Sequence, residues 1–468
     1  MQIKNPRNGQ FDYTIFPPKK AALKKQTSAM REAQTAWAEM PISERVVVMQ
    51  LWKKAVENHK SELIEALCLD TGRKWETLLE ADLVASSIDR WCGIATTFFA
   101  EPTRKQSSIP FLDIQQDVVA YGLVGVISPW NFPLLLSLID TIPALLAGCA
   151  VLVKPSEVTP RFIKIIEKTI AEVPILRGVF AYVEGAGKTG ADMVEMCDLI
   201  CFTGSTSTGK KVYLSAAKLF KPVFLELGGK DAALVFDSAD VEQATSALLW
   251  GSVANAGQSC LSVERIYVQE GIFDDFVRKL TEKAAKLNLA FPTYDSGVIG
   301  PIISDKQVLI INDHLEDAIL RGAKIETGNS KCEELEGGFY CRPTVLTNVN
   351  MDMKVMKEET FGPILPVMKF KNRAEGLALA NGTIYGLSGA VFTNNIEDSI
   401  AVGKLMNAGA ISINDAALTA VMHEGEKNSF KMSGIGGTRM GPSAIKRFMR
   451  QKAFLIKNQS MDSPWWFR

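Results

Sequence analysis

The first hundred residues carry apolar side chains at helical spacing. Because apolar residues three and four positions apart share one face of a helix, the pattern predicts helices over residues 21–40, 43–69 and 75–99. Pro41 separates the first helix from the second, and Gly72 separates the second from the third. We therefore expect the N-terminal part of the chain to form a helical layer.

The pattern changes after Pro110, where strand-like segments begin. Residues 114–119 and 121–127 are expected to pair with each other as neighbouring strands. Short apolar runs then alternate with helical stretches, and one helix is expected to begin at Pro160 behind a Thr159 cap. Strands are predicted over residues 124–127, 151–153, 179–183, 199–202 and 223–225, and after Lys230 over 232–236 and 263–268. Such alternation predicts parallel β-α-β units, which bind ligands at the carboxyl ends of their strands.

Composition narrows the class of protein. The chain has 468 residues, of which 47% are hydrophobic and 22% are charged, as in a soluble globular protein of two to four domains. Lys plus Arg and Asp plus Glu both number 52, so the composition indicates no binding to nucleic acid or to an anionic membrane. The N-terminus lacks the pattern of a signal peptide, and the apolar runs are too short to cross a bilayer. We therefore expect a cytoplasmic protein.

Cysteine and histidine usage argues against metal chemistry. The eight cysteines form no CxxC pair, and the three histidines lie far apart in the sequence. No HExxH motif or Cys/His cluster is present, so a zinc enzyme is disfavoured and we predict no metal site. A histidine-based catalytic triad has little support, and most of the thiols are expected to be buried and free.

Two glycine loops follow consecutive predicted strands. Residues 185–190 (GAGKTG) fit GxGxxG, and residues 204–209 (GSTSTG) precede a lysine. A P-loop interpretation fails in the first because Tyr182 stands where a glycine is needed. It fails in the second because Lys211 replaces the Ser or Thr that would bind magnesium. Each loop alone is typical of a tight turn, but the two together favour a dinucleotide.

Six short segments in a fixed order carry the most specific signal. They are PWNFP (129–133), KPSE (154–157), FTGS (202–205), ELGGK (226–230), GQSC (257–260) and ETFGP (359–363). In these segments the chain resembles the aldehyde dehydrogenase superfamily, over nearly its whole length. Members of that superfamily oxidise an aldehyde through a thiohemiacetal and a thioester. This chemistry needs a nucleophilic thiol, an oxyanion donor, a base and a bound dinucleotide.

The resemblance assigns three catalytic residues. It implies that Cys260 is the nucleophile and that Asn131, with the Cys260 backbone N–H, stabilises the oxyanion. Glu226 lies 34 residues before Cys260, as in the family, where this glutamate activates the water that hydrolyses the thioester. Family members that transfer the acyl group to coenzyme A lack it, so its presence favours a free acid as the product.

The resemblance also implies a cofactor site. Lys154 and Glu157 are expected at the adenosine ribose, residues 204–209 at the pyrophosphate, and Glu359 with Phe361 beside the nicotinamide. A carboxylate at Glu157 would repel a 2′-phosphate, which favours NAD, with NADP as the alternative. The expected cofactor-binding residues are Ser128, Pro129, Trp130, Lys154, Ser156, Glu157, Gly185, Gly190, Gly204, Ser205, Thr208, Gly209, Leu227, Glu359 and Phe361.

The substrate side is less specific. Phe132, Leu135 and Leu261 are expected to line the substrate tunnel, and the absence of an arginine pair there favours apolar aliphatic or aromatic aldehydes. The chain departs from the family at Asp140, where several members have a lysine. It also departs in the long, mixed loop 415–427, which is expected at the substrate entrance, and Lys431 is expected to close over the active site.

These observations predict an α/β protein with three parts. They are a Rossmann-like NAD-binding domain (1–103 and 120–228), a second α/β catalytic domain (229–445) and a small β oligomerisation element (104–119 and 446–468). Because the β element is too small to bury its own faces, we expect a homodimer or a dimer of dimers. The aromatic tail at Trp465, Trp466 and Phe467 lacks the amphipathic helix of a membrane anchor, so burial against a partner subunit is preferred.

Two other functions compete with the dehydrogenase. One is a thiol acyltransferase or thioester hydrolase that uses Cys260 without redox chemistry and needs no nicotinamide. The other is a catalytically silent relative with a binding or structural role, which the intact set of Asn131, Glu226 and Cys260 argues against.

Overall fold

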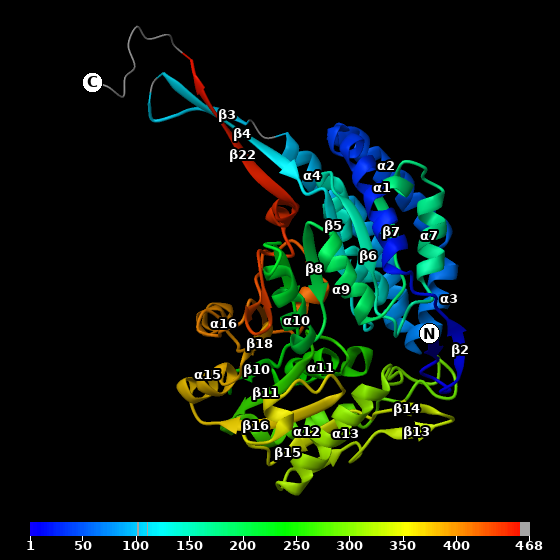
Figure 1. Ribbon diagram of the computed structural model, residues 1–468. Helices are drawn as coiled ribbons and strands as arrows, with labels where there is room; N and C mark the ends of the chain where they lie inside the picture. Colours follow the sequence, from blue (N-terminus) through cyan, green and yellow to red (C-terminus); the bar gives the residue numbers. More distant parts are fainter. Residues whose placement is uncertain (101–102, 110, 459–468) are drawn as a thin grey trace.

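Two parallel-stranded sheets and a protruding β arm form the protein (Figure 1). The computed structural model describes residues 1–100, 103–109 and 111–458. The buried hydrophobic residues form two separate cores, one around each sheet. One gathers buried residues between positions 23 and 227 together with residues 444–449, and the other gathers residues between 232 and 416. The expected α/β class is confirmed, and Figure 1 shows one sheet above the other.

The N-terminal helical layer has four helices rather than three. They are α1 (Lys20–Glu39), α2 (Ile42–Asn58), α3 (Lys60–Thr71) and α4 (Trp75–Phe99). The segment 43–69, expected to be one helix, is interrupted at His59, whose ring nitrogens lie 2.6 Å from carboxylate oxygens of Glu62 and Glu172. Gly72 ends α3 in the left-handed conformation, a backbone geometry that glycine adopts readily.

The first sheet has six strands in the order β21-β9-β8-β5-β6-β7, all parallel except β21. They are β5 (Leu123–Ile127), β6 (Ala150–Lys154), β7 (Phe180–Tyr182), β8 (Leu199–Thr203), β9 (Val223–Glu226) and β21 (Gly434–Ile435). The connecting helices are α5 (Pro133–Leu138), α6 (Thr141–Ala147), α7 (Ile163–Ala171), α8 (Leu176–Val179), α9 (Gly187–Met196) and α10 (Thr206–Ala217).

Two local predictions are wrong in this part. The segments 114–119 and 121–127 do not pair with each other, because β4 belongs to the arm while β5 lies between β6 and β8. Strand β5 is buried along its whole length, as the centre of a parallel sheet requires. The helix expected at Pro160 begins at Ile163, and the Thr159 hydroxyl donates to the Trp130 carbonyl instead of capping it.

The second sheet has seven strands in the order β12-β15-β16-β11-β10-β18-β19, with only β12 antiparallel to its neighbour. They are β10 (Asp231–Val235), β11 (Val263–Gln269), β12 (Lys324–Thr327), β15 (Thr344–Thr347), β16 (Ile364–Phe370), β18 (Ser388–Phe392) and β19 (Ala410–Ile413). The helices of this half are α11 (Val241–Val253), α12 (Phe273–Ala284), α13 (Asp305–Leu320), α14 (Lys354–Lys357), α15 (Arg373–Asn381) and α16 (Ile396–Gly403).

Short pieces complete the fold. The two-stranded pairs are β1 (Gln2–Lys4) with β2 (Phe11–Thr14), β13 (Glu333–Leu335) with β14 (Gly338–Tyr340), and β17 (Tyr385–Gly386) with β20 (Phe430–Lys431). The 3₁₀ turns are η1 (Ala254–Gly257), η2 (Glu270–Ile272), η3 (Leu418–Ala420) and η4 (Pro442–Phe448). In the ranges that the structure describes, no helix is long and apolar enough to cross a membrane.

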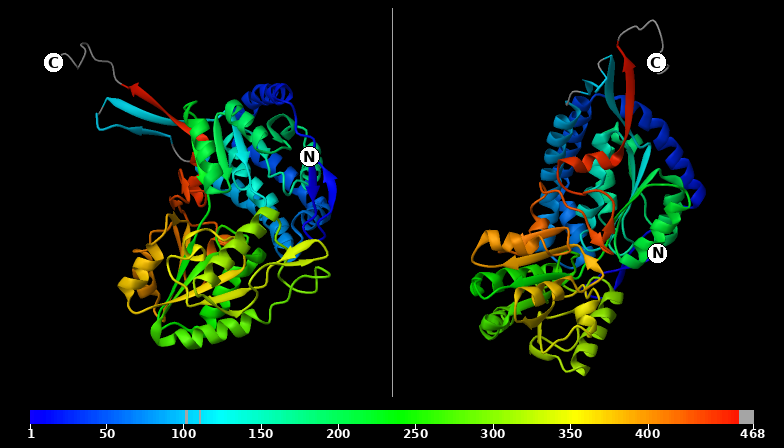
Figure 2. Two further views of the ribbon diagram at one scale, coloured as in Figure 1. Left: turned by 60° about the horizontal axis from the view of Figure 1, so that its bottom comes forward. Right: turned by 90° about the vertical axis from the view of Figure 1, so that its left-hand side faces the viewer.

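The arm is a three-stranded antiparallel sheet in the order β22-β4-β3. Strands β22 (Met449–Lys457) and β4 (Leu112–Ala120) pair along nine residues, and β3 (Arg104–Gln106) pairs with the far side of β4. All three extend away from the body, as two further views confirm (Figure 2). The aromatic tail with Trp465, Trp466 and Phe467 lies outside the described residues.

Candidate active site

Cys260 lies in a turn between α11 and β11. Before it, Asn255 and Ala256 adopt left-handed backbone conformations, and so does Gly257, with φ of 70°. A Cβ atom at Gly257 would lie 2.3 Å from the carbonyl carbon and oxygen of Gly362, so only glycine allows this close approach. The GQSC segment therefore packs directly against the ETFGP segment, which is distant in sequence.

Asn131 connects the first sheet to the same turn. Its buried side-chain amide donates to the Gln258 carbonyl at 3.0 Å, and the Asn255 side chain donates to the Asn131 carbonyl at 3.1 Å. An amide NH₂ has two hydrogens, and the bond to Gln258 uses one of them. The other has no acceptor among the residues that the structure describes.

Glu226 is the last residue of β9, and the chain then turns toward Cys260. A Cβ atom at Gly229 would lie 2.8 Å from the Cys260 carbonyl oxygen, and one at Gly228 would lie 2.3 Å from a carboxylate oxygen of Glu359. The two glycines thus let the backbone after Glu226 run between Cys260 and Glu359. Four of the predicted segments converge here: PWNFP, ELGGK, GQSC and ETFGP.

Burial shapes the acid-base properties of this region. It raises the pKa of Glu359 to about 8, with repulsion by Glu264 adding to the effect, while the Gly229 N–H donates to this carboxylate at 3.1 Å. Burial also raises the pKa of the Cys260 thiol to about 12, although the charge of Lys427 opposes the rise. In the unliganded protein the thiol is therefore protonated at neutral pH, and nucleophilic attack requires a proton acceptor.

A buried network orients the ETFGP segment. The Glu264 carboxylate accepts hydrogen bonds from the backbone N–H groups of Thr360 and Phe361, at 2.7 and 2.8 Å, and from the Lys230 ammonium at 2.5 Å. Phe361 has a left-handed backbone, and its ring lies 5.4 Å from that of Trp130 in an edge-to-face contact. Sequence reasoning missed Glu264, because a single charged residue within a predicted strand carries no specific signal.

The residues predicted to bind the dinucleotide lie mostly at the carboxyl ends of the first sheet's strands. The Lys154 ammonium is buried, donates to the Gly185 carbonyl at 2.6 Å and lies 3.6 Å from the Glu157 carboxylate. It thereby joins the KPSE segment to the 185–190 loop. Ser128, Pro129 and Trp130 follow β5, Ser156 follows β6, Gly185 and Gly190 follow β7, and Gly204, Ser205, Thr208 and Gly209 follow β8.

The start of α10 has the geometry that a pyrophosphate site needs. The Ser205 hydroxyl caps the helix by accepting from the Thr208 N–H at 3.4 Å. A Cβ atom at Gly209 would lie 2.4 Å from the Leu227 side chain, so this helix packs closely against the residue after Glu226. Free N–H groups and the helix dipole at such a terminus favour an anion.

Phe132 and Leu135, predicted to line the substrate tunnel, are held by a buried ion pair. Arg73 and Glu80 are 3.0 Å apart, the Arg73 guanidinium lies 4.3 Å from the Phe132 ring centroid, and Glu80 accepts from the Leu135 N–H at 2.8 Å. Leu261, the third tunnel prediction, follows Cys260 and its N–H donates to the Ser259 hydroxyl at 3.3 Å. The pair thus positions Phe132 within the PWNFP turn and Leu135 just after it.

Lys431 does not cover the thiol as expected. Its ammonium donates to the carbonyls of Asn381 and Thr383, at 2.9 and 3.0 Å, because the β17–β20 pairing directs it there. The cation that acts on Cys260 is Lys427, at the end of the 415–427 loop. Ser429, which follows this loop, donates to the Glu226 carboxylate at 2.7 Å.

Asp140 has its own charged partners. Its carboxylate lies 2.7 Å from an Arg439 nitrogen and 3.1 Å from an Arg447 nitrogen, and all three side chains are buried. Burial alone would raise the pKa of Asp140, but the two guanidinium groups outweigh it and hold the pKa below its usual value. The acidic residue at this position is therefore part of a buried ion triad.

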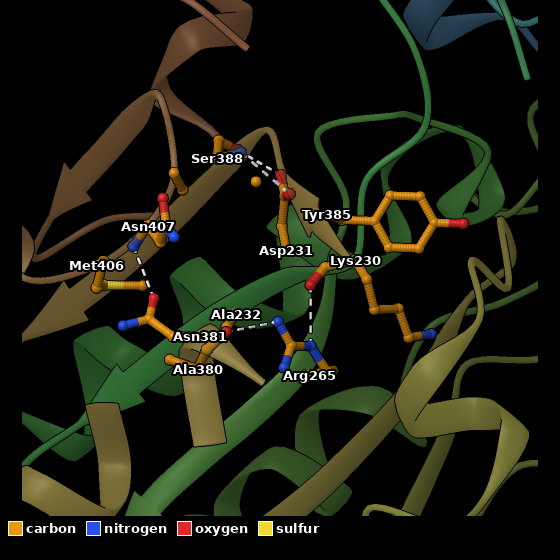
Figure 3. Close-up of a pocket in the computed structure, with 12 residues that line it drawn as sticks. Lys230, Asp231, Ala232, Arg265, Ala380, Asn381, Tyr385, Ser388, Met406 and Asn407 are labelled. Atoms are coloured by element: carbon orange, nitrogen blue, oxygen red, sulfur yellow. Dashed lines mark hydrogen bonds between the residues drawn. The ribbon is translucent and has the colours of Figure 1, made fainter. Parts of the chain in front are cut away.

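A small cavity in the second half is lined by Lys230, Asp231 and Arg265 among others, but not by the three catalytic candidates. Figure 3 shows Asp231 pointing toward Ser388, and Arg265 toward the Lys230 backbone. Its free volume is about 10 Å³, room for about one water molecule. Cys260, Glu226 and Asn131 do not line it, and it is too small for an aldehyde or a dinucleotide.

Comparison with known proteins identifies one family along nearly the whole chain. A model of the aldehyde dehydrogenase family matches residues 1–454. A 4,4′-diapolycopene aldehyde oxidase from Methylomonas sp. is 37% identical over 438 residues, which cover 90% of this chain and 79% of that protein. The betaine aldehyde dehydrogenase of Bacillus subtilis is 32% identical over 475 residues, which cover 99% and 95%.

Solved structures agree in fold. An aldehyde dehydrogenase structure from Anabaena variabilis, named PutA, superposes with a TM-score of 0.98 at 55% identity, covering all of both chains. Betaine aldehyde dehydrogenase from Staphylococcus aureus, solved in complex with NAD⁺, superposes with a TM-score of 0.92 at 30% identity, covering 99% of this chain and 93% of that one.

Proposed function

Because this chain belongs to the aldehyde dehydrogenase family, we propose that Cys260, Glu226 and Asn131 carry its reaction. The enzyme is an NAD(P)-dependent aldehyde dehydrogenase that oxidises an aldehyde to a carboxylic acid. The observation that carries the assignment of residues is the packing of the PWNFP, ELGGK and ETFGP segments against the turn that holds Cys260. The Gly229 and Gly257 backbones approach Cys260 and Gly362 more closely than any side chain would allow.

In the proposed mechanism the Cys260 thiol passes its proton to solvent water and attacks the aldehyde carbon, which gives a tetrahedral thiohemiacetal. The Asn131 amide and the Cys260 backbone N–H donate to the oxyanion. The bound nicotinamide supplies a hydride acceptor. Loss of hydride from the tetrahedral carbon leaves a thioester on Cys260, and water activated by Glu226 hydrolyses it to the acid and the free thiol.

The dinucleotide is proposed to lie across the carboxyl ends of the first sheet. The Glu157 carboxylate beside Lys154 is suited to the two ribose hydroxyls, and the N-terminus of α10 is suited to the pyrophosphate. We assign residues 1–103 and 120–228 to the NAD-binding domain and residues 229–445 to the catalytic domain. The two hydrophobic cores support this division except at Ala444 and Ile445, which pack into the core of the first half.

The substrate is proposed to be an apolar aliphatic or aromatic aldehyde. Phe132 lies within the PWNFP turn and Leu135 lies two residues after it, and among the relatives is one named for a 4,4′-diapolycopene aldehyde. The product is a free carboxylic acid. A panel of aldehydes of different length and charge, assayed by NADH absorbance with NAD and with NADP, tests the substrate, the cofactor and the need for redox chemistry together.

The catalytic assignment is tested by two substitutions. Cys260→Ala should abolish NADH formation, by several orders of magnitude in rate, while NAD still binds. Glu226→Gln should leave the first turnover nearly intact and accumulate an acyl adduct on Cys260, visible by intact mass. Cys332→Ala, a buried thiol outside the site, is the matched control. Substantial dehydrogenase activity in Cys260→Ala would refute the assignment.

The cytoplasm is proposed as the location, and a homodimer or a dimer of dimers as the assembly. Strand β22 pairs with β4 on one side, and its other edge has no partner among the strands that the structure describes. On this strand Leu455 is 80% exposed, and Phe454 beside it is also exposed. Such an edge is typical of an interface between subunits.

A further inference from the structure

The segment from residue 428 to residue 435 connects the two halves of the molecule next to Glu226. Strand β20 pairs with β17, with Phe430 opposite Gly386 in the second half. Strand β21 then pairs with β9 of the first sheet, with Gly434 opposite Glu226. The Leu227 N–H donates to the Ser433 carbonyl at 2.8 Å. This segment therefore lies across the end of the strand that carries Glu226.

Ser429, at the start of this segment, bonds directly to the glutamate. Its hydroxyl donates to Oε2 of Glu226 at 2.7 Å, and both residues are half-buried. The position of Ser429 depends on Gly434, because a Cβ atom there would lie 2.6 Å from the Ser429 Cβ. The same Cβ would lie 2.4 Å from the Leu225 carbonyl oxygen. The absence of a side chain at Gly434 thus makes room for the Ser429 hydroxyl beside Glu226.

The hydrogen bond divides the roles of the two carboxylate oxygens. Oε2 is held by Ser429, whereas Oε1 has no hydrogen bond to any residue that the structure describes. A donated hydrogen bond restricts the rotation of the carboxylate. Oε1 is therefore left free to accept a proton from a water molecule.

The other polar side chains beside the Glu226 carboxylate have different hydrogen-bond partners. Thr203 lies opposite Glu226 on β8, and its hydroxyl accepts from Arg439 at 2.8 Å rather than bonding to Glu226. Arg439 in turn is bound to Asp140. Among the described residues, Ser429 is the one side chain that donates a hydrogen bond to Glu226.

We propose that Ser429 is a positioning residue that holds the Glu226 carboxylate for hydrolysis of the thioester on Cys260. This inference rests on the proposed role of Glu226. The restraint should affect only one of the two steps. Hydrolysis needs the Glu226 carboxylate in position to activate a water molecule, whereas attack by Cys260 on a carbonyl carbon does not. Removing the hydroxyl should therefore slow hydrolysis and spare formation of the acyl-enzyme.

The test uses 4-nitrophenyl acetate with the full-length enzyme, so that it does not depend on knowing the aldehyde. The Cys260 thiol displaces 4-nitrophenolate and retains the acetyl group as a thioester, which water then hydrolyses to acetate and the free thiol. The initial burst of nitrophenolate reports acylation, and the later steady rate reports hydrolysis.

In Ser429→Ala we expect the steady rate to fall about tenfold, the loss expected for one hydrogen bond to a charged group, with the burst rate within about twofold of wild type. Ser429→Thr, which keeps a hydroxyl, should retain more of the steady rate than Ser429→Ala. Ser443→Ala is the matched control, because that serine interacts with Glu426 rather than Glu226, and both rates should be unchanged.

The proposal is wrong if Ser429→Ala keeps the wild-type steady rate, if burst and steady rates fall together, or if Ser429→Thr loses as much as Ser429→Ala. Glu226→Gln separates this inference from the proposed function. A normal steady rate in Glu226→Gln would refute the role of the glutamate itself. A lost steady rate in Glu226→Gln with a normal one in Ser429→Ala would refute only the role of Ser429.

Discussion

At the scale of single residues, function depends on how burial and charge act on a few ionisable groups. Cys260 and Glu359 both lie where burial raises the pKa, and both face backbone atoms of the ELGGK segment. Lys154 is buried as well, and burial lowers its pKa while the nearby Glu157 carboxylate opposes the change. These environments are built from glycine contacts and charge pairs that only the folded chain brings together.

The raised pKa of Cys260, about 12, predicts slow alkylation in the unliganded enzyme. Thiolate is the reactive form, so below that pKa the rate of modification by iodoacetamide should rise about tenfold per pH unit. Between pH 7 and 10 the rate at Cys260, followed by peptide mass, should show no plateau. The half-buried Cys68 offers an internal comparison, since burial also raises its pKa. A plateau for Cys260 near neutral pH would contradict this prediction.

Glu157 should determine the preference between the two dinucleotides. Replacing it with glutamine removes the charge that would repel a 2′-phosphate, so the kcat/KM for NADP should rise toward that for NAD. A tenfold change in preference corresponds to about 1.4 kcal/mol, which one charge contact can supply. Steady-state kinetics with both cofactors measure the ratio. The control is Glu172→Gln, at an exposed glutamate after α7 that bonds to His59. A wild-type enzyme that prefers NADP would contradict the assignment.

At the scale of elements, contacts between segments far apart in sequence hold the site together. The Asp140 triad joins α6 to the loop after β21 and to η4, since Asp140 precedes α6, Arg439 lies in the loop and Arg447 lies in η4. Its three charged side chains lie almost wholly out of solvent. A buried carboxylate between two guanidinium groups is costly to disturb, because removing one partner leaves the others uncompensated.

Asp140→Asn should therefore lower the free energy of unfolding by about 3–5 kcal/mol. Because the pKa of Asp140 is held below its unfolded value, this contribution is present above the unfolded pKa and is lost as the pH falls through the folded one. Urea unfolding at pH 7 and at acidic pH measures both effects, with the difference between variant and wild type shrinking in acid. Asp275→Asn, in an exposed pair with Arg278, should change the free energy of unfolding far less. Equal losses in the two variants would contradict the prediction.

At the scale of the whole molecule, the arm is the feature that the two sheets do not explain. It extends away from both cores. Its edge strand β22 carries two neighbouring apolar residues, Phe454 and Leu455, whose side chains are exposed. An isolated three-stranded sheet with exposed apolar residues is marginal in water. A second copy of the chain would cover these side chains.

Leu455→Glu should therefore weaken the proposed dimer. Light scattering coupled to size exclusion should show the wild type as a dimer or tetramer and the variant shifted toward smaller species, with circular dichroism unchanged because the residue is 80% exposed. Leu309→Glu, at a leucine that is 70% exposed on α13, is the matched control and should leave the assembly unchanged. A stable, active wild-type monomer would rule out the proposed assembly.

The sequence by itself determined the α/β class, the alternation of the parallel strands and the family, because each rests on local patterns or on motif order. The start of α10 at Thr206 and the end of α3 at Gly72 were predictable from capping and glycine chemistry. The split of the second helix at His59 and the separation of β4 from β5 were not, because both depend on partners distant in sequence.

Only the tertiary structure decided which side chains surround the catalytic candidates. Lys431 was expected over the thiol, but the β17–β20 pairing directs it to backbone carbonyls, and Lys427 acts on Cys260 instead. Ser429 and Glu264 carry no motif, and their partners, Glu226 and the Thr360 backbone, lie 203 and 96 residues away along the chain. Contacts over such separations are set by the packing of the two halves, because local propensity and motif spacing hold no information about them.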